Sequence, residues 1–181
     1  MNLRLCLARL YLPAGLRKRK LEELLLLTAR AFDAAPPSVE GLSLEGTRRR
    51  YAEFSQEVAE RALGRPEGLT TIRERLFDEA LHLGREIARE LGVSTRQEAM
   101  AAARILYRGL EIDLRGDDKG DIVIRRCSFS RNYSPEVCRL VSSLDAGILS
   151  GLAGGGELEF EQRLTEGADC CRAHFSFPGA P

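Results

Sequence analysis

The sequence predicts an α+β fold, in which a helical N-terminal half packs on a four-stranded antiparallel sheet with one helix between two hairpins. Apolar residues recur at helical spacing through most of the first half of the chain. After Gly109 they alternate with polar residues, as in half-buried strands. We expect a helical N-terminal region over residues 1–68 and an α+β domain over residues 69–181 that carries a cysteine cluster.

The composition is typical of an ordinary globular protein. The 181 residues are 44% hydrophobic and 30% charged, which is enough apolar material to bury a core. Lys and Arg together number 27, as do Asp and Glu, so the whole chain has no electrostatic attraction to nucleic acid. No apolar run reaches the roughly 20 residues that a membrane-spanning helix needs. We expect a cytoplasmic protein with no nucleic-acid partner and no membrane span.

The N-terminal segment is basic. Residues 1–20 contain no acid and six basic residues, which are Arg4, Arg9, Arg17, Lys18, Arg19 and Lys20. We interpret them as a solvated arm or helix start, with a partner-binding or membrane-surface patch as the alternative. The arginines within LRLCLARLYL argue against the apolar core of a signal peptide.

Four helices are predicted before the change of period. They cover about residues 21–32, 45–63, 69–91 and 94–110. Two prolines follow the first helix, and Gly92 stands where a C-terminal cap of the third is expected. Ser94 is the predicted N-cap of the fourth, with Gln97 at capping-box spacing.

A hairpin and a helix are predicted next. Residues 110–129 alternate on both sides of GDDKG, which places Cys127 near the end of the second strand. Ser134 is a predicted N-cap and Pro135 suits the first helical position, so a helix is expected from there to about residue 152.

Two further strands are predicted over residues 157–164 and 170–177. The alternation puts these side chains on one face of their strands: Leu158, Phe160, Gln162 and Leu164, then Cys171, Ala173, Phe175 and Phe177. His174 shares the opposite face with Cys170 and Arg172. As one of only two histidines, it is a candidate for proton transfer, and a solvent-side, hydrogen-bonded histidine is the alternative.

The cysteines lie at positions 6, 127, 138, 170 and 171, an odd number that does not favour a disulfide framework. Cys138 falls near the first turn of its predicted helix, where the helix dipole favours a thiolate. A small buried hydrophobic side chain is the alternative for any one of them. If Cys127, Cys138 and Cys171 converge, three thiolates with an open fourth position could hold a zinc ion, and no other cofactor is expected.

Asp145 and two glycines follow Cys138 in the same predicted helix. Asp145 comes seven residues later, so it shares a face with Cys138. A carboxylate on this apolar face has either a function or a partner, and the candidate partners are Arg125, Arg126 and Arg172. Gly147 and Gly151 leave a flat strip, either for a ligand or for close packing of another element.

Residues 122–175 contain three motifs in the order IVIRRCSF, PEVCRLVSSLDAGILSGL and RLTEGADCCRAHF. They resemble the L-2-amino-thiazoline-4-carboxylic acid hydrolase family. That family's strand-end cysteine, helix cysteine with a following acid and final Gly-x-x-x-Cys correspond to Cys127, Cys138, Asp145, Gly167 and Cys171. The resemblance implies hydrolysis of a cyclic C–N bond of amidine or thiazoline type. Cys138 or a metal-bound water would attack, and Asp145 or His174 would move protons.

The same region is also similar to the 4-vinyl reductase domain, a small-molecule-binding module. Its cysteine, downstream helix glycine and late Gly-x-x-x-Cys correspond to Cys138, Gly147, Gly167 and Cys171. This likeness implies a non-catalytic ligand- or metal-binding module acting as a sensor, carrier or adaptor. A protein-interaction subunit is a third hypothesis. The expected partner is a small-molecule ligand or substrate, and a homodimer is left open.

Overall fold

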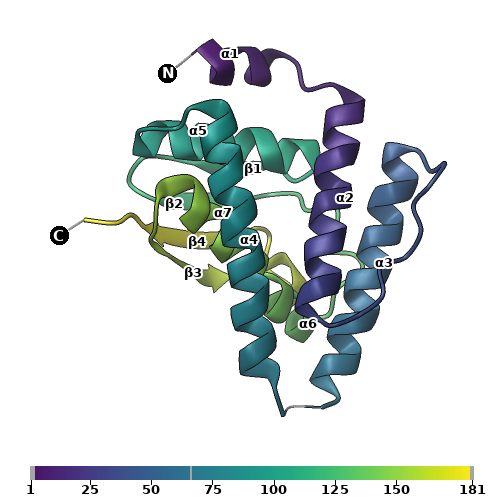
Figure 1. Ribbon diagram of the computed structural model, residues 1–181. Coiled ribbons are helices and arrows are strands. Elements are labelled where there is room, and N and C mark those ends of the chain that lie inside the picture. The colour runs from purple at the N-terminus through teal and green to yellow at the C-terminus, as the bar shows by residue number, and fades with distance from the viewer. Residues whose placement is uncertain (1–2, 66, 180–181) are drawn as a thin grey trace.

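The computed structural model describes residues 3–65 and 67–179 (Figure 1). Five helices come first: α1 (Leu3–Leu10), α2 (Ala14–Ala31), α3 (Leu44–Leu63), α4 (Leu69–Leu91) and α5 (Arg96–Gly109). They are followed by β1 (Leu114–Gly116), β2 (Asp121–Ile124), α6 (Pro135–Val141), α7 (Ser143–Ala153), β3 (Glu157–Gln162), the 3-10 turn η1 (Leu164–Glu166) and β4 (Cys171–Ser176). The predicted α+β fold is confirmed.

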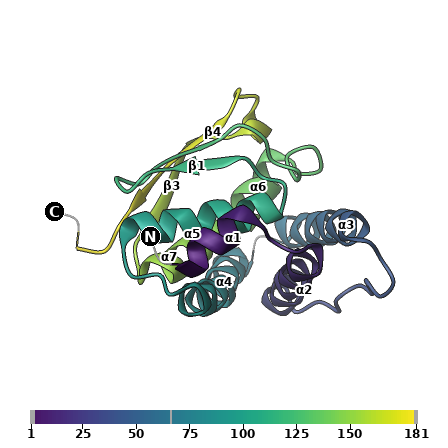
Figure 2. The ribbon, with the colours of Figure 1, turned by 90° about the horizontal axis from the view of Figure 1, so that it is seen from above.

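The two predicted hairpins join into one four-stranded antiparallel sheet with the order β1-β2-β4-β3. Helices α5 and α7 lie directly against one face of this sheet, and α4 lies beneath them (Figure 2). Helices α2 and α3 form a pair beside α4 (Figure 2). The helices with the main contacts to the sheet are therefore α5 and α7, while α4 packs on α7, α1 on α5, and α2 and α3 on one another and on α4 and α6.

The predicted alternation along β4 is confirmed. Cys171, Ala173 and Phe175 are buried on the face that the helices cover, whereas Arg172 and His174 are exposed. The other strand of this hairpin is shorter than predicted. β3 ends at Gln162 after a shift of register between Phe160 and Gln162, so Leu164 lies in η1.

One hydrophobic core runs through both predicted regions. Leu21 of α2, Leu76 of α4 and Phe175 of β4 belong to the same cluster of buried residues. The core is therefore not divided near residue 68.

The predicted single helix from Pro135 is two helices. Ser134 caps α6 as expected by accepting a hydrogen bond from the Val137 N–H, and Pro135 occupies the first turn. The helix then breaks at Ser142, whose hydroxyl donates to the Arg139 carbonyl at 3.1 Å. A hydroxyl that bonds to the preceding turn competes with the helical ladder, and α7 begins at the next residue.

The glycines of α7 pack against α4. A Cβ atom on Gly147 would lie 2.3 Å from the Phe77 carbonyl oxygen, and one on Gly151 would lie 2.4 Å from that of Leu81. Gly84 of α4 faces the backbone of α7 equally closely. The predicted flat strip therefore holds two helix backbones together, and the ligand-binding role predicted for Gly147 and Gly151 is wrong because α4 fills that space.

The C-terminal cap of α4 is the residue predicted, whereas the N-terminal cap of α5 is not. Gly92 ends α4 in the left-handed conformation, with a φ of 66°, as expected. The N-cap of α5 is Thr95, which accepts from the Glu98 N–H, and the Glu98 carboxylate accepts from the Ser94 N–H and hydroxyl. The N-cap is thus one residue later than predicted. The carboxylate that accepts hydrogen bonds from the residue before the cap belongs to Glu98, whereas the prediction assigned this part to Gln97.

The basic N-terminal segment is helical. Leu5 of α1 is fully buried, while Leu7 and Leu10 on the same helix are exposed. At the start of α2, Lys20 forms ion pairs with Glu23 and with Glu90 of α4. No helix in residues 3–65 and 67–179 is long and apolar enough to cross a membrane.

Candidate functional site

A pocket of about 80 Å³ lies between the sheet and the α6–α7 pair, and α3 and α5 contribute further walls. Cys127, Cys138, Asp145 and Cys171 all line it. The structure therefore brings together the three thiols and the carboxylate that the sequence singled out. Pockets for drug-sized ligands measure about 300–1,000 Å³, so this one suits a much smaller molecule.

Asp145 faces the pocket from the first turn of α7. Asp145 is half-buried, and the protein that surrounds its carboxyl group removes much of the solvation of the charged form. This burial raises the pKa of Asp145 to about 6, although the Tyr107 hydrogen bond and the Arg163 charge both lower it. A carboxyl group that titrates near neutral pH is suited to proton transfer.

The partner of Asp145 is a tyrosine. The Tyr107 hydroxyl of α5 donates a hydrogen bond to Asp145 Oδ1 at 2.5 Å. The predicted alternative, an ion pair with Arg125, Arg126 or Arg172, is wrong. Arg172 points to the exposed face of β4, and Arg125 and Arg126 are exposed beyond the end of β2.

Cys138 lies in the first turns of α6, as predicted, but its thiol is not acidic. Burial raises its pKa, and the negative charge of Asp145 raises it further. The Thr165 hydroxyl and the Arg163 guanidinium lower this pKa only in part. A neutral thiol is therefore favoured in the resting protein over the predicted thiolate, because burial outweighs the interactions with Thr165 and Arg163.

The other two thiols of the pocket are also neutral. Cys127 lies in the loop beyond β2, not on the strand as predicted, and burial raises its pKa to about 12. Burial raises the pKa of Cys171 too, although its sulfur accepts a hydrogen bond from the Leu164 N–H at 3.4 Å.

The three thiols are not grouped as metal ligands in the structure described. Among the described residues, no group of three or more His, Cys, Asp or Glu side chains is arranged to hold a metal ion. Cys127, Cys138 and Cys171 line one pocket, and burial raises the pKa of each thiol. A zinc ion held by the three thiols stays a prediction.

His174 lies away from the pocket. It projects from the exposed face of β4, where its Nδ1 is 3.2 Å from Asp121 Oδ1. The predicted outward face of His174 is confirmed, and its position agrees with the alternative of a solvent-side, hydrogen-bonded histidine. Since Cys171 and Ala173 take the covered face, His174 does not line the pocket, and its candidate role in proton transfer there has no support. His82 is exposed on α4.

Arg163 is a pocket residue that the sequence did not reveal. The alternation that was predicted to put Gln162 and Leu164 on one face would leave Arg163 on the other, but after the register shift before Gln162 the Arg163 side chain lines the pocket. Its side chain is 12% exposed, and its guanidinium carbon lies 3.8 Å from the centre of the Phe160 ring. Arg163 Nη1 and the nearby Thr165 Oγ1 are buried and have no hydrogen-bond partner.

Three of the four tyrosines also line the pocket. Burial raises the pKa values of Tyr51, Tyr107 and Tyr133, so all three hydroxyls stay protonated. Tyr133 Oη and Ser55 Oγ are 2.5 Å apart, which ties the loop before α6 to α3. The only signal in the sequence was that Tyr51 and Tyr107 fall on the apolar faces of their helices.

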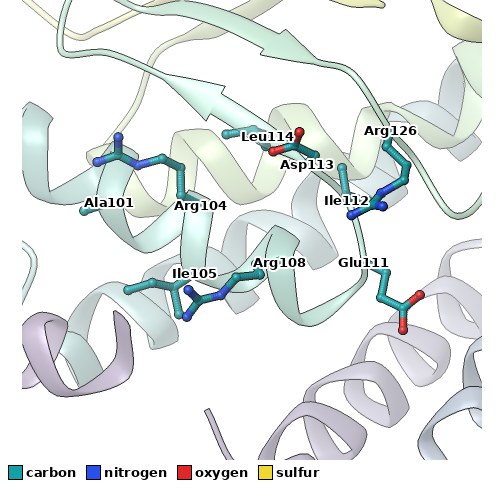
Figure 3. A pocket seen from close by; sticks show the side chains of 9 residues that line it. All are labelled: Ala101, Arg104, Ile105, Arg108, Glu111, Ile112, Asp113, Leu114 and Arg126. Carbon is teal, nitrogen blue, oxygen red and sulfur yellow. The ribbon is translucent and has the colours of Figure 1, made fainter. Parts of the chain in front are cut away.

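A larger, open groove of about 410 Å³ runs between α5 and the β1–β2 hairpin (Figure 3). None of the predicted site residues lines it. Figure 3 shows Arg104 and Arg126 at opposite ends of this groove. Arg104 and Arg108 already donate to the carbonyls of Gly116 and Ala8. The smaller pocket, where Cys138, Asp145 and the other thiols converge, is therefore the candidate site.

No model of a known protein family matches the chain, and no curated protein matches it significantly.

Proposed function

We propose that the pocket of Cys138 and Asp145 is the active site of a small-molecule hydrolase that opens a cyclic C–N bond of amidine or thiazoline type. The observation that carries this proposal is the convergence of Cys138 with Asp145, whose pKa is about 6, in one pocket. The resemblance to the L-2-amino-thiazoline-4-carboxylic acid hydrolase family supplies the substrate class.

Asp145 moves the proton in this proposal. With a pKa of about 6, both of its protonation states are populated near neutral pH. Its carboxylate can accept a proton from the attacking group, and the resulting acid can return that proton to the departing ring nitrogen. The Tyr107 hydroxyl holds Oδ1 of this carboxylate in place.

Cys138 is the proposed nucleophile. Because its thiol is neutral at rest, its proton passes to Asp145 as the sulfur adds to the amidine-like carbon. The C–N bond then breaks, the nitrogen takes the proton, and one water hydrolyses the sulfur-bound intermediate to release the free thiol. Arg163 and Thr165 are the two groups whose interactions favour the thiolate during this step.

The experiment is a ring-opening assay with L-2-amino-thiazoline-4-carboxylic acid and related cyclic amidines. Cys138→Ser should abolish turnover, and Asp145→Asn should lower kcat/KM by at least about a hundredfold. Cys6→Ser is the matched control, because Cys6 lies on α1 outside the pocket and its loss should leave kcat/KM unchanged. Full activity in Cys138→Ser would rule out the nucleophile, and absence of turnover with the whole set would rule out the hydrolase.

A non-catalytic binding module is the second candidate, and one observation favours it. The pKa values of all three pocket thiols are raised, so none is a ready nucleophile. In this case the pocket would hold a small molecule unchanged, as in a sensor, carrier or adaptor. The same cyclic amidines would then bind, as measured by calorimetry, and be recovered intact.

A further inference from the structure

We infer that Arg163 and Thr165 form an anion anchor in the pocket, which holds a carboxylate or a similarly small anionic group of the bound molecule. The inference rests on the proposed function only in taking the pocket as the place where a small molecule binds. It adds a specificity-determining pair and a charge requirement for the ligand.

The first support is the absence of hydrogen-bond partners for two neighbouring donors. Nearly all buried polar groups in folded proteins are hydrogen-bonded. In the described part of the chain, four buried side-chain nitrogen or oxygen atoms have no nitrogen or oxygen partner, and two of them are Arg163 Nη1 and Thr165 Oγ1, whose residues interact instead with the weakly accepting Cys138 sulfur. Both residues line the same pocket. A ligand that accepts hydrogen bonds from both atoms would satisfy them together.

The second support is the unbalanced charge of the guanidinium. One of its faces lies on the Phe160 ring, and Nε is 3.9 Å from Glu166. Glu166 is held more closely by Arg139 Nη2, at 2.7 Å. Asp145 is the other acid nearby, and with a pKa of about 6 its carboxylate balances part of this charge at neutral pH and less of it at lower pH. A buried cation whose acidic neighbours are shared with Arg139 or partly protonated favours an anionic ligand.

The third support is the position of the anchor beside Cys138. Both Arg163 and Thr165 interact with the Cys138 thiol strongly enough to lower its pKa, so a group bound between them lies next to that sulfur. The thiol itself does not supply the missing negative charge, because burial keeps it protonated. An anionic ligand would therefore be anchored directly beside the proposed nucleophile.

A pair of alkylating reagents tests the anchor without knowledge of the natural ligand. Iodoacetate and iodoacetamide are nearly equal in size, but only iodoacetate is charged. In each reaction the Cys138 sulfur bonds to the methylene carbon, iodide leaves with the bonding electrons, and the thiol proton passes to solvent. The measured quantity is the ratio of the two rate constants at Cys138, obtained by mass spectrometry and divided by the same ratio for the unfolded chain.

We expect iodoacetate to be favoured by about tenfold in the native protein, the size of effect that a charge-assisted hydrogen bond gives. Arg163→Met should return the ratio to that of the unfolded chain, and Thr165→Val should lower it in part. Any change in the Cys138 pKa cancels, since both reagents attack the same thiolate. Arg172→Met is the matched control, because Arg172 lies on the exposed face of β4 and its loss should leave the preference intact.

Three results would overturn the anchor. They are a native ratio equal to that of the unfolded chain, an unchanged ratio in Arg163→Met, and a Cys138 that neither reagent modifies. If Arg163→Met does not fold, Arg163→Lys and Thr165→Val test the anchor in its place, since both changes should reduce the preference for iodoacetate over iodoacetamide. The ratio does not depend on turnover. A high preference for iodoacetate without any ring opening would reject the proposed hydrolase activity alone. Ring opening with the preference of the unfolded chain would reject the anion anchor alone.

Discussion

The Tyr107 hydroxyl of α5 donates a hydrogen bond to Asp145 of α7 across 2.5 Å, and this contact joins two helices at the wall of the pocket. Tyr107 is fully buried and Asp145 faces the cavity, so the bond lies where water competes little. It is one of the interactions that lower the pKa of Asp145, which burial otherwise raises. The contact therefore affects both the stability of the fold and the protonation of the candidate site.

Replacing Tyr107 by Phe should destabilise the protein by about 1–3 kcal/mol, because a buried acceptor loses its donor. The pKa of Asp145 should also rise above about 6, since the bond that lowers it is gone. Urea unfolding and carboxyl titration by NMR measure the two effects. Tyr51→Phe is the control, because the Tyr51 hydroxyl has only a 3.4 Å contact with Thr28 Oγ1. Equal losses in the two variants would contradict the importance of the Asp145 contact.

Asp145 should make the stability of the protein depend on pH between about 4 and 6. The folded protein binds a proton at Asp145 more tightly than the unfolded chain, whose pKa is near the ordinary 3.8. Stability therefore falls as the pH rises through this window, by about 3 kcal/mol at most. The Asp145→Asn side chain does not titrate, but it can still accept the hydrogen bond from Tyr107. As the pH rises from about 4 to 6, the free energy of unfolding of this variant should therefore increase relative to that of the native protein.

Urea unfolding of both proteins at a series of pH values measures this difference, and the other titrating groups cancel in it. A difference that stays constant from pH 4 to pH 7 would show that the pKa of Asp145 is not raised.

If Asp145 acts as the base, its protonation should also control the rate. We expect kcat/KM for ring opening to rise with pH through a midpoint near 6, because only the carboxylate accepts a proton. In Tyr107→Phe the midpoint should move to higher pH. A profile without a step in this region would assign the proton transfer to another group.

The contact between α4 and α7 should not tolerate a methyl group. Ala normally stabilises a helix relative to Gly by about 1 kcal/mol. Gly147→Ala and Gly151→Ala should instead destabilise the protein by about 1–3 kcal/mol, because the added Cβ meets backbone carbonyls of α4.

Gly15→Ala serves as the control for these two variants. Gly15 lies in α2, and a Cβ added there has no atom within 4 Å, so this change should be neutral or slightly stabilising. Thermal unfolding compares the three variants. Stabilisation by Gly147→Ala would mean that the two helices are further apart than described.

The arrangement of Cys127, Cys138 and Cys171 predicts protein without stoichiometric zinc, since the three thiols form no ligand set among the described residues. Elemental analysis after purification without a chelator is the measurement, together with thiol titration before and after unfolding. All five cysteines should react once the chain is unfolded, whereas Cys127 and Cys171 should react slowly in the native state. One zinc per chain with three protected thiols would contradict this arrangement.

Much of the fold could be predicted because its signals are local. The caps at Gly92 and Ser134, the helical stripes and the alternation along β4 each depend on residues within a few positions of one another. The errors arose where two local signals compete. At Ser142 a hydroxyl bonds back to the preceding turn, and the helical period on both sides conceals the break.

The candidate site was predictable only in part. Alternation placed Cys171 correctly on the covered face and His174 on the other, so the sequence already separated these two side chains. Gly147 and Gly151 were correctly predicted to allow a close approach, but only the structure identifies α4 as the element that approaches. Arg163 was missed because a single register shift reverses which residues of a strand point inward.

Residue types and their spacing were thus sufficient to predict an α+β chain with its hairpins, and they selected Cys127, Cys138, Asp145 and Cys171 as residues of interest. The tertiary structure decided what those residues are chemically. Whether a thiol or carboxyl group is charged depends on how much water and which neighbours surround it, and those neighbours come from distant parts of the chain. Burial keeps the Cys138 thiol neutral and brings the pKa of Asp145 to about 6, next to an arginine that the sequence had placed on the opposite face.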